Sequence, residues 1–268
     1  MKLSYKIIIC LLLNSFSLSQ TFAAAPSPSE GTTAGKYSLL TQLPKLQPLK
    51  PLILLEGGGF SASQGSVQNI GIEGLIGDHF TLAHPQAQNG LLGLGLYWQG
   101  REYPRYDVFY GINAFFFAHT IVSGYVVQED TFVNLFYRYS LYNYPIYLAA
   151  KAIKHSDNYS LTFDFGVGAN IINTAHFYEY PLMGSDAIPD TYILAGQQSL
   201  APSAMIGIGI KFKSIYGYSL FNESLPLEIG YRFFYLGRGK LNKINSELMN
   251  TLNTGTNYAN AIILTISC

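Results

Sequence analysis

Charged side chains are scarce in this 268-residue chain. Asp, Glu, Lys and Arg make up 12% of it, against about 25% in a typical soluble domain. The 16 basic residues are matched by 16 acidic ones, so no excess of positive charge points to a nucleic-acid partner. Hydrophobic residues nevertheless reach 49% and aromatic residues 15%, which excludes intrinsic disorder. A chain this apolar and this poor in charge is predicted to contact lipid.

The N-terminus has the three-part pattern of a secretory signal peptide. Lys2 and Lys6 form a short positive region, the apolar stretch 7–16 follows, and small residues stand at 23–25. We therefore predict a signal peptide over residues 1–25 that directs the protein through the inner membrane and is then cleaved.

Cysteine is nearly absent, with only Cys10 and Cys268 in the chain. Cys10 could indicate a lipoprotein, but the bulky Ile9 stands where a lipobox requires a small residue. Cys10 lies inside the predicted signal peptide, so the mature protein keeps one thiol. That excludes an intramolecular disulfide and a thiolate metal site.

Residues 26–50 are rich in proline, which blocks both helix and sheet pairing, and we predict an extended periplasmic leader there. The remainder, 51–268, is predicted to be one barrel domain. It contains eight apolar segments rich in the aromatic and β-branched residues that favour strands. These segments are 52–60, 91–98, 106–127, 131–153, 160–172, 203–213, 225–236 and 258–267.

The period of these segments is two. In 225–236, Ile229, Tyr231 and Phe233 alternate with Gly230 and Arg232. One face of each strand is apolar, and the other is small or charged. In a transmembrane β-barrel the apolar face meets lipid and the other face lines the lumen. The sequence thus predicts an all-β, eight-stranded antiparallel barrel.

A helical membrane protein is the competing interpretation. Residues 108–128 carry no charged side chain and are long enough to cross a bilayer as a helix. Aromatic and β-branched residues dominate that stretch, however, and the later segments are too short for membrane helices. The gaps favour the barrel, because the long ones at 61–90, 173–202 and 237–257 all fall on one side if the first strand starts in the periplasm.

Two local features are expected within this barrel. The apolar face of 131–153 changes parity: an early outward set is followed by a later one. The early set is Val133, Leu135, Tyr137 and Tyr139, and the later set is Ile146, Leu148 and Ala150. A β-bulge near 143–145 would produce that change, since proline is tolerated at bulges. In the last long gap, Leu241, Ile244, Leu248 and Leu252 recur at helical spacing. They predict a short amphipathic helix within 240–252 that caps the barrel mouth, with contact to the membrane surface as the alternative.

On this pattern the chain resembles the small outer-membrane β-barrels of Gram-negative bacteria, in particular the group of the OmpA transmembrane domain and OmpW. The resemblance spans about 52–268 and includes no signature motif. The last strand, with Ile262, Leu264 and Ile266 on one face, is similar to the assembly signal of that group. It departs at Cys268, where an aromatic residue is usual.

Projecting the strands inward places nine charged residues in the lumen. They are Glu56, Asp107, Arg138, Lys151, Asp164, Lys211, Lys213, Glu228 and Arg232. Buried charges have to pair, and eight strands enclose a space that side chains can fill. We predict a salt-bridged, plugged interior centred on Arg138, Glu228 and Arg232. A narrow gated channel is the alternative.

Other chemistry has weak support. Gly93, Gly166 and Gly207 belong to Gly-x-Gly pairs that lie within strands, not at the strand-to-helix turns of phosphate-binding loops. Asp78 and His79 form one adjacent pair, whereas metal sites need three or four ligands. No catalytic constellation, cofactor or metal site is therefore predicted.

The predicted function is a non-enzymatic outer-membrane protein with a structural or surface-interaction role. The alternatives are a narrow, OmpW-like channel for small or hydrophobic solutes and, with least support, an outer-membrane enzyme. The expected partners are outer-membrane lipid and lipopolysaccharide, the barrel-assembly machinery, and an unidentified extracellular or host partner; no nucleic acid is expected.

Overall fold

The computed structural model describes residues 51–184, 189, 193–212 and 226–267. The predicted signal peptide and leader, Lys213 and Cys268 lie outside the described residues. The described part contains twelve strands: β1 (Pro51–Ser63), β2 (Gln68–Ile70), β3 (Asp78–Phe80), β4 (Gln86–Tyr103), β5 (Tyr106–Gln128), β6 (Phe132–His155), β7 (Tyr159–Pro181), β8 (Leu194–Ala195), β9 (Gln198–Phe212), β10 (Leu227–Gly237), β11 (Asn242–Lys243) and β12 (Asn257–Ser267). In these residues no helix is long and apolar enough to cross a membrane.

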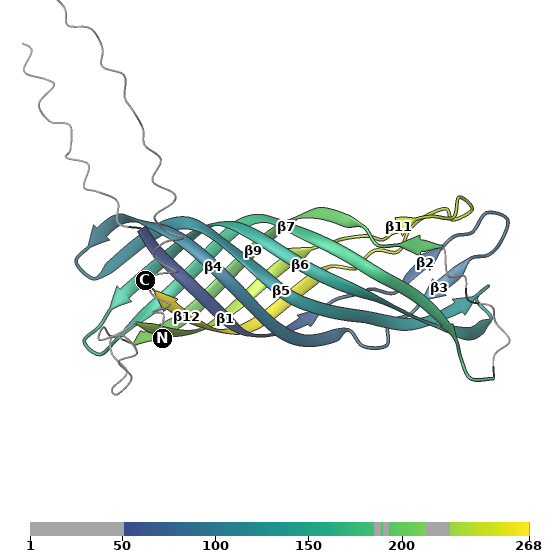
Figure 1. Cartoon of the computed structure of the whole chain (residues 1–268), viewed down its shortest axis with the longest axis horizontal. Coiled ribbons are helices and arrows are strands. Elements are labelled where there is room, and N and C mark those ends of the chain that lie inside the picture. Colours follow the sequence, from purple (N-terminus) through teal and green to yellow (C-terminus); the bar gives the residue numbers. More distant parts are fainter. Residues whose placement is uncertain (1–50, 185–188, 190–192, 213–225, 268) are drawn as a thin grey trace, which may run out of the picture. The chain divides into compact units, whose positions relative to one another are not determined.

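Eight of the strands form a closed antiparallel ring in the order β1, β4, β5, β6, β7, β9, β10 and β12 (Figure 1). The ring closes where β12 pairs with β1, in a register that runs from Leu54 opposite Ser267 to Ser63 opposite Tyr258. Closure pairs the backbone of every ring strand on both sides and leaves no free sheet edge. The predicted eight-stranded barrel is confirmed, and each predicted segment overlaps one ring strand.

The connections differ sharply between the two ends of the barrel. At one end, which we call the turn end, β4 passes to β5 through residues 104–105 and β6 passes to β7 through 156–158. At the other, the loop end, the connections 64–85, 182–197 and 238–256 are long. Short strands pair within this end: β3 of the first long connection pairs with the ring strand β5, and β11 pairs with β8, which joins the other two long connections. The fourth connection at the loop end, 129–131, is short, and the connection from β9 to β10 lies mostly outside the described residues. The three long connections lie at one end of the barrel, as predicted.

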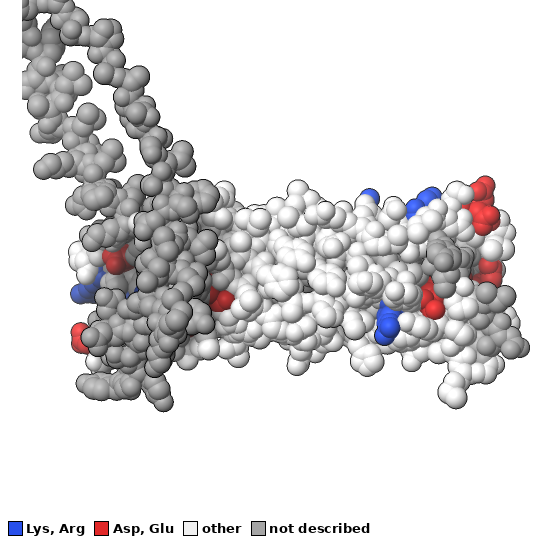
Figure 2. Space-filling model, viewed as in Figure 1, with Lys and Arg blue, Asp and Glu red and all other residues white. Residues whose placement is uncertain are grey.

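The outer wall carries a continuous band of exposed apolar side chains. Members include Leu55, Leu92, Leu94, Ile112, Ile146, Leu148, Phe163, Phe165, Ile206, Ile208, Ile229, Ile262 and Leu264. In the view of Figure 2 the charged side chains gather toward the two ends, and the middle of the wall is free of them. A soluble protein rarely exposes so large an apolar surface, whereas a transmembrane barrel presents such a band to lipid.

The predicted change of parity within β6 is wrong. Alternate residues from Leu135 to Ile153 stay buried along the whole strand, so Tyr137 and Tyr139 point inward. Arg138 is therefore exposed on the outside, with its guanidinium 5.3 Å from the ring centre of Tyr180. The placement of Arg138 in the lumen was wrong.

The irregularities that change parity lie on the strands flanking β6. Between β5 and β6 the register shifts from Phe117 to Thr120, and both side chains are buried although they are three residues apart. Between β6 and β7 it shifts opposite Arg138, near His176, whose φ is +53°. Pro145 sits in regular register, so the bulge predicted there was also wrong.

Cysteine labelling tests the orientation of β6. In a Cys268→Ser background, we expect Arg138→Cys in the folded barrel to react with a hydrophilic maleimide and Leu135→Cys to react at least about tenfold more slowly, because the second side chain is buried. Both variants should react at the same rate in guanidinium chloride. Faster labelling at position 135 than at 138 in the folded protein would restore the sequence-based orientation.

The predicted helix over 240–252 is also wrong. Leu241 N–H donates to the carbonyl of Leu252, and Lys240 bridges to Asn253, so this segment is an extended hairpin. Leu241, Leu248 and Leu252 are buried, as expected of residues that cap a mouth, whereas Ile244 is exposed. A hairpin achieves this burial because Leu248 pairs with Ile72 in the first long connection.

Candidate functional site: the charged layer inside the barrel

Five charged side chains converge inside the barrel from four strands. Glu56 comes from β1, Lys151 from β6, Asp164 from β7, and Glu228 and Arg232 from β10. Each occupies an inward position of its strand, and each residue is less than 5% exposed. The strand alternation that sends apolar side chains to the outer wall therefore sends these charges to the interior.

Ion pairs join the five residues into one chain. Lys151 Nζ lies 2.8 Å from Glu228 Oε1 and 3.1 Å from Asp164 Oδ1. Arg232 Nη2 lies 3.1 Å from Asp164 Oδ2 and 2.5 Å from Glu56 Oε1. Asp164 thus bridges the two cations. The layer contains three carboxylates and two cations, so each cation is shared between two acids.

Neutral side chains add hydrogen bonds to two of the carboxylates, Glu228 and Glu56. Thr162 Oγ1 donates to Glu228 Oε1 over 2.9 Å, and Asn113 Nδ2 donates to Glu56 Oε2 over 3.0 Å. Thr265 Oγ1 also donates to Glu56, over 3.3 Å. Charges removed from water are tolerated only with such partners, which gives these polar residues a structural role that the sequence analysis missed.

Glycines on the lumen face make room for the charged side chains. A Cβ atom at Gly207 would lie 2.7 Å from Arg232 Cγ, and one at Gly93 would lie 2.9 Å from Glu56 Oε2. Two of the three Gly-x-Gly pairs that resemble phosphate-binding motifs in the sequence, those at Gly93 and Gly207, therefore adjoin this ion-paired layer, whereas Gly166 lies against Met205 and Tyr147.

An aromatic layer packs against the charged layer on the side of the loop end. Phe115 and Phe117 each make an edge contact with Phe234, at 5.1 Å between ring centres. The Arg232 guanidinium lies 5.5 Å from the ring centre of Phe115. The interior is therefore not lined by small and polar residues alone, as the alternation had suggested. Beyond this layer a second apolar cluster, which includes Val126, fills the barrel toward the loop end.

The other predicted lumen charges do not belong to this chain of ion pairs. Asp107 is partly exposed at the turn end, where Oδ2 lies 2.8 Å from His155 Nε2. Lys211 stands at an inward position of β9, as predicted, opposite Glu228 of β10. It is partly buried and donates to Ser267 Oγ over 3.3 Å. Arg138 is on the outer wall, and Lys213 lies outside the described residues. The predicted centre of the network thus includes Glu228 and Arg232 without Arg138.

The Asp78–His79 pair belongs to the packing of the first long connection. His79 Nδ1 is hydrogen-bonded to Asn69 Oδ1 across the β2–β3 pair. Within the described ranges, no group of three or more His, Cys, Asp or Glu side chains is arranged to hold a metal ion.

A closed antiparallel ring of eight strands, with apolar side chains outside and paired charges inside, defines the class of small outer-membrane β-barrels. No family model matches the chain, and no curated protein matches it.

Solved structures do match. They include the outer membrane protein OprG from Pseudomonas aeruginosa, with 11% identity over 82% of this chain and 97% of that chain and a TM-score of 0.40. The outer membrane protease OmpT from Escherichia coli has 9% identity over 82% and 95%, with a TM-score of 0.38. Neisserial surface protein A has 9% identity over 80% and 95%, with a TM-score of 0.37. These similarities assign no activity to this chain.

Proposed function

We propose that this chain is a non-enzymatic protein of the bacterial outer membrane, exported by a cleaved signal peptide over residues 1–25. Its lumen is closed, and its role is structural or lies in surface interactions of the loop end. The observation that carries the proposal is the filled interior, in which a chain of five buried charges is covered by an aromatic layer.

The energetics of the charged layer favour closure. A solute passing along the barrel axis would have to separate Arg232 from Glu56 or Lys151 from Glu228. Breaking a buried pair costs about 3–5 kcal/mol, and the edge contacts of Phe234 would have to open as well. Eight strands leave little space in which these side chains could move aside.

The long connections at the loop end are hydrogen-bonded to one another and form a platform, which supports the proposed surface role. Gln68 Nε2 donates to the carbonyl of Asn253 over 2.7 Å, and Met249 N–H donates to the carbonyl of Gly71 over 2.7 Å. These bonds tie the first long connection to the last one. Exposed apolar side chains, among them Ile76 and Met249, stand on this platform, and such patches mark interaction sites.

Planar-bilayer recording tests the closed lumen. We expect the purified wild-type monomer to insert without producing a steady conductance, because the charged and aromatic layers fill the barrel. Heat-shifted gel migration of the same sample verifies that the inserted protein is folded. A large, steady conductance from folded monomer would contradict closure and favour the narrow channel.

A further inference from the structure

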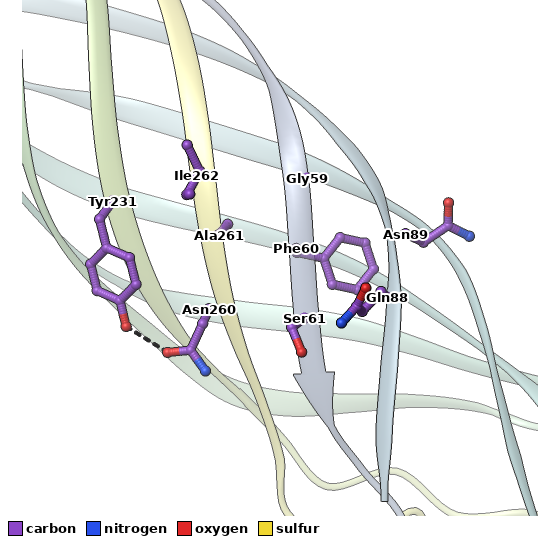
Figure 3. A pocket seen from close by; sticks show the side chains of 9 residues that line it. All are labelled: Gly59, Phe60, Ser61, Gln88, Asn89, Tyr231, Asn260, Ala261 and Ile262. Atoms are coloured by element: carbon purple, nitrogen blue, oxygen red, sulfur yellow. Dashed lines mark hydrogen bonds between the residues drawn. The ribbon is translucent and has the colours of Figure 1, made fainter. Parts of the chain in front are cut away.

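An open groove of about 660 Å³ crosses the outer wall over β10, β12, β1 and β4 (Figure 3). The groove exists because Gly59 has no side chain. A Cβ atom there would meet nothing closer than the carbonyl oxygen of Asn89 at 4.0 Å. The backbone of Ala261 continues the floor, and the exposed side chains of Tyr231 and Ile262 stand on one side.

A fixed amide group lies at the polar end of this groove. The hydroxyl of Tyr231 donates to Asn260 Oδ1 over 2.5 Å, on the outer wall of the barrel. This bond holds the oxygen of the amide, so that Asn260 Nδ2 faces away from Tyr231 toward the side of Ser61 (Figure 3). The groove therefore offers an oriented N–H donor.

The groove lies where the apolar band ends. Along the outward face of β12, Leu264 and Ile262 belong to the band, Asn260 follows, and Tyr258 comes next. The ring of Tyr258 lies 5.7 Å from that of Tyr235, and aromatic girdles of this kind mark the membrane interface. An amide at this depth loses water on its lipid side, and a donor without an acceptor there is costly.

The lining selects one kind of occupant. None of the nine lining residues is charged, so the groove has no partner for a phosphate or an ammonium group. It changes from apolar at Ile262 to hydrogen-bonding at Asn260. An esterified or amidated fatty acid has the same order of groups, with a hydrocarbon chain that ends in a neutral carbonyl.

We propose that this groove binds one acyl chain of an outer-leaflet lipid, with the chain lying over Gly59 and its ester or amide carbonyl accepting a hydrogen bond from Asn260 Nδ2. The inference rests on the proposed outer-membrane location. It gives the otherwise apolar wall one specific lipid site.

Retention of lipid by the purified barrel tests the site. The protein is taken from vesicles of diacyl phosphatidylethanolamine, or of its ether-linked analogue without ester carbonyls, and retained lipid is counted by native mass spectrometry. Wild type should keep one diacyl lipid and bind the ether analogue about tenfold more weakly, the effect of one hydrogen bond. Asn260→Leu should abolish this preference.

A second experiment measures lipid retention after a larger side chain is placed in the groove. Gly59→Leu should lower retention at least about tenfold, since its side chain occupies the groove. Gly57→Leu is the matched control, because position 57 is outside the groove lining and its Cβ would meet only Leu92 Cδ2, at 3.6 Å. Both variants should keep the heat shift of the folded barrel.

Three results would overturn the site while leaving the barrel intact. They are equal retention by the two glycine variants, equal binding of ester and ether lipids by wild type, and a wild-type dimer that Gly59→Leu converts to monomer. The last would make a second copy the occupant. Loss of the heat shift in wild type would instead refute the proposed membrane barrel, and the lipid site with it.

Discussion

Replacing Arg232 with methionine is expected to lower the free energy of unfolding by about 3–5 kcal/mol. The guanidinium lies between Glu56 and Asp164 in a layer that already has one more acid than base. Its removal leaves Lys151 as the one cation among three carboxylates within this layer. A buried carboxylate without a partner costs far more than a broken surface pair.

The measurement is the urea concentration at the midpoint of unfolding, for the refolded barrel in detergent micelles. The dependence of the unfolding free energy on urea concentration should be the same for wild type and variant, so that the midpoints can be compared. Arg238→Met is the matched control, because Arg238 follows the same strand but is exposed and hydrogen-bonds to Thr256. It should change stability by less than about 1 kcal/mol. Equal losses for the two variants would mean that the charged layer does not stabilise the barrel.

Because the charged layer has more acids than bases, neutralising an acid should cost less stability than removing a base. Glu228→Gln keeps an oxygen that can accept from Lys151 and Thr162, and it leaves two carboxylates for two cations. We expect this variant to lose less than half as much stability as Arg232→Met in the same urea series. A larger loss for Glu228→Gln would contradict the described charge balance.

Replacing Gly58 with alanine is expected to cost at least about 3 kcal/mol, or to prevent folding. A Cβ atom there would lie 2.0 Å from the carbonyl oxygen of Ile262 and 3.0 Å from the Cα of Ile263. Both atoms belong to the backbone of β12, which is paired with β1 on one side and β10 on the other. The clash can be relieved only by opening the seam that closes the barrel.

The neighbouring glycines provide controls within the same run. A Cβ atom at Gly57 or Gly59 would meet nothing closer than 3.6 Å, so Gly57→Ala and Gly59→Ala should fold with wild-type yield. The fraction of protein that shows the heat-shifted gel band after refolding measures the effect. Normal folding of Gly58→Ala would contradict the described pairing of β1 with β12.

The sequence predicts the ring strands well because their alternation has a single cause. Where a strand faces lipid, its outer face has to be apolar. In β9 the outer face carries Ile206 and Ile208, and the inner face carries residues such as Gly207 and Lys211. The lengths of the connections then place the long loops at one end.

The same logic fails beyond the apolar band. There the buried Tyr137, Tyr139 and Val126 fill the interior, and Arg138 is exposed on the outer face, so the apolar face is the inner one. Sequence alternation alone cannot distinguish this arrangement from a lipid-facing strand, which explains the wrong orientation of Arg138. The register shift near His176 is equally hidden, because one extra residue leaves no mark in composition.

The charged layer could be predicted in part. Glu56, Lys151, Asp164, Glu228 and Arg232 all stand at the inward positions that alternation gives them. Which of them pair depends on the stagger between strands. The separation of 77 positions between Lys151 and Glu228 gives no indication that Nζ and Oε1 are 2.8 Å apart.

Covalent closure of the barrel in cells tests the central claim most directly. Leu55 and Ile266 are direct partners across the β1–β12 seam and both face outward. In a Cys268→Ser background, we expect the pair Leu55→Cys and Ile266→Cys to form a disulfide in the outer-membrane fraction, which changes gel migration even after boiling without reductant. Leu55→Cys with Leu264→Cys, two residues out of register, should link poorly. No disulfide at the registered pair, or its formation only in the inner-membrane fraction, would contradict a closed outer-membrane barrel.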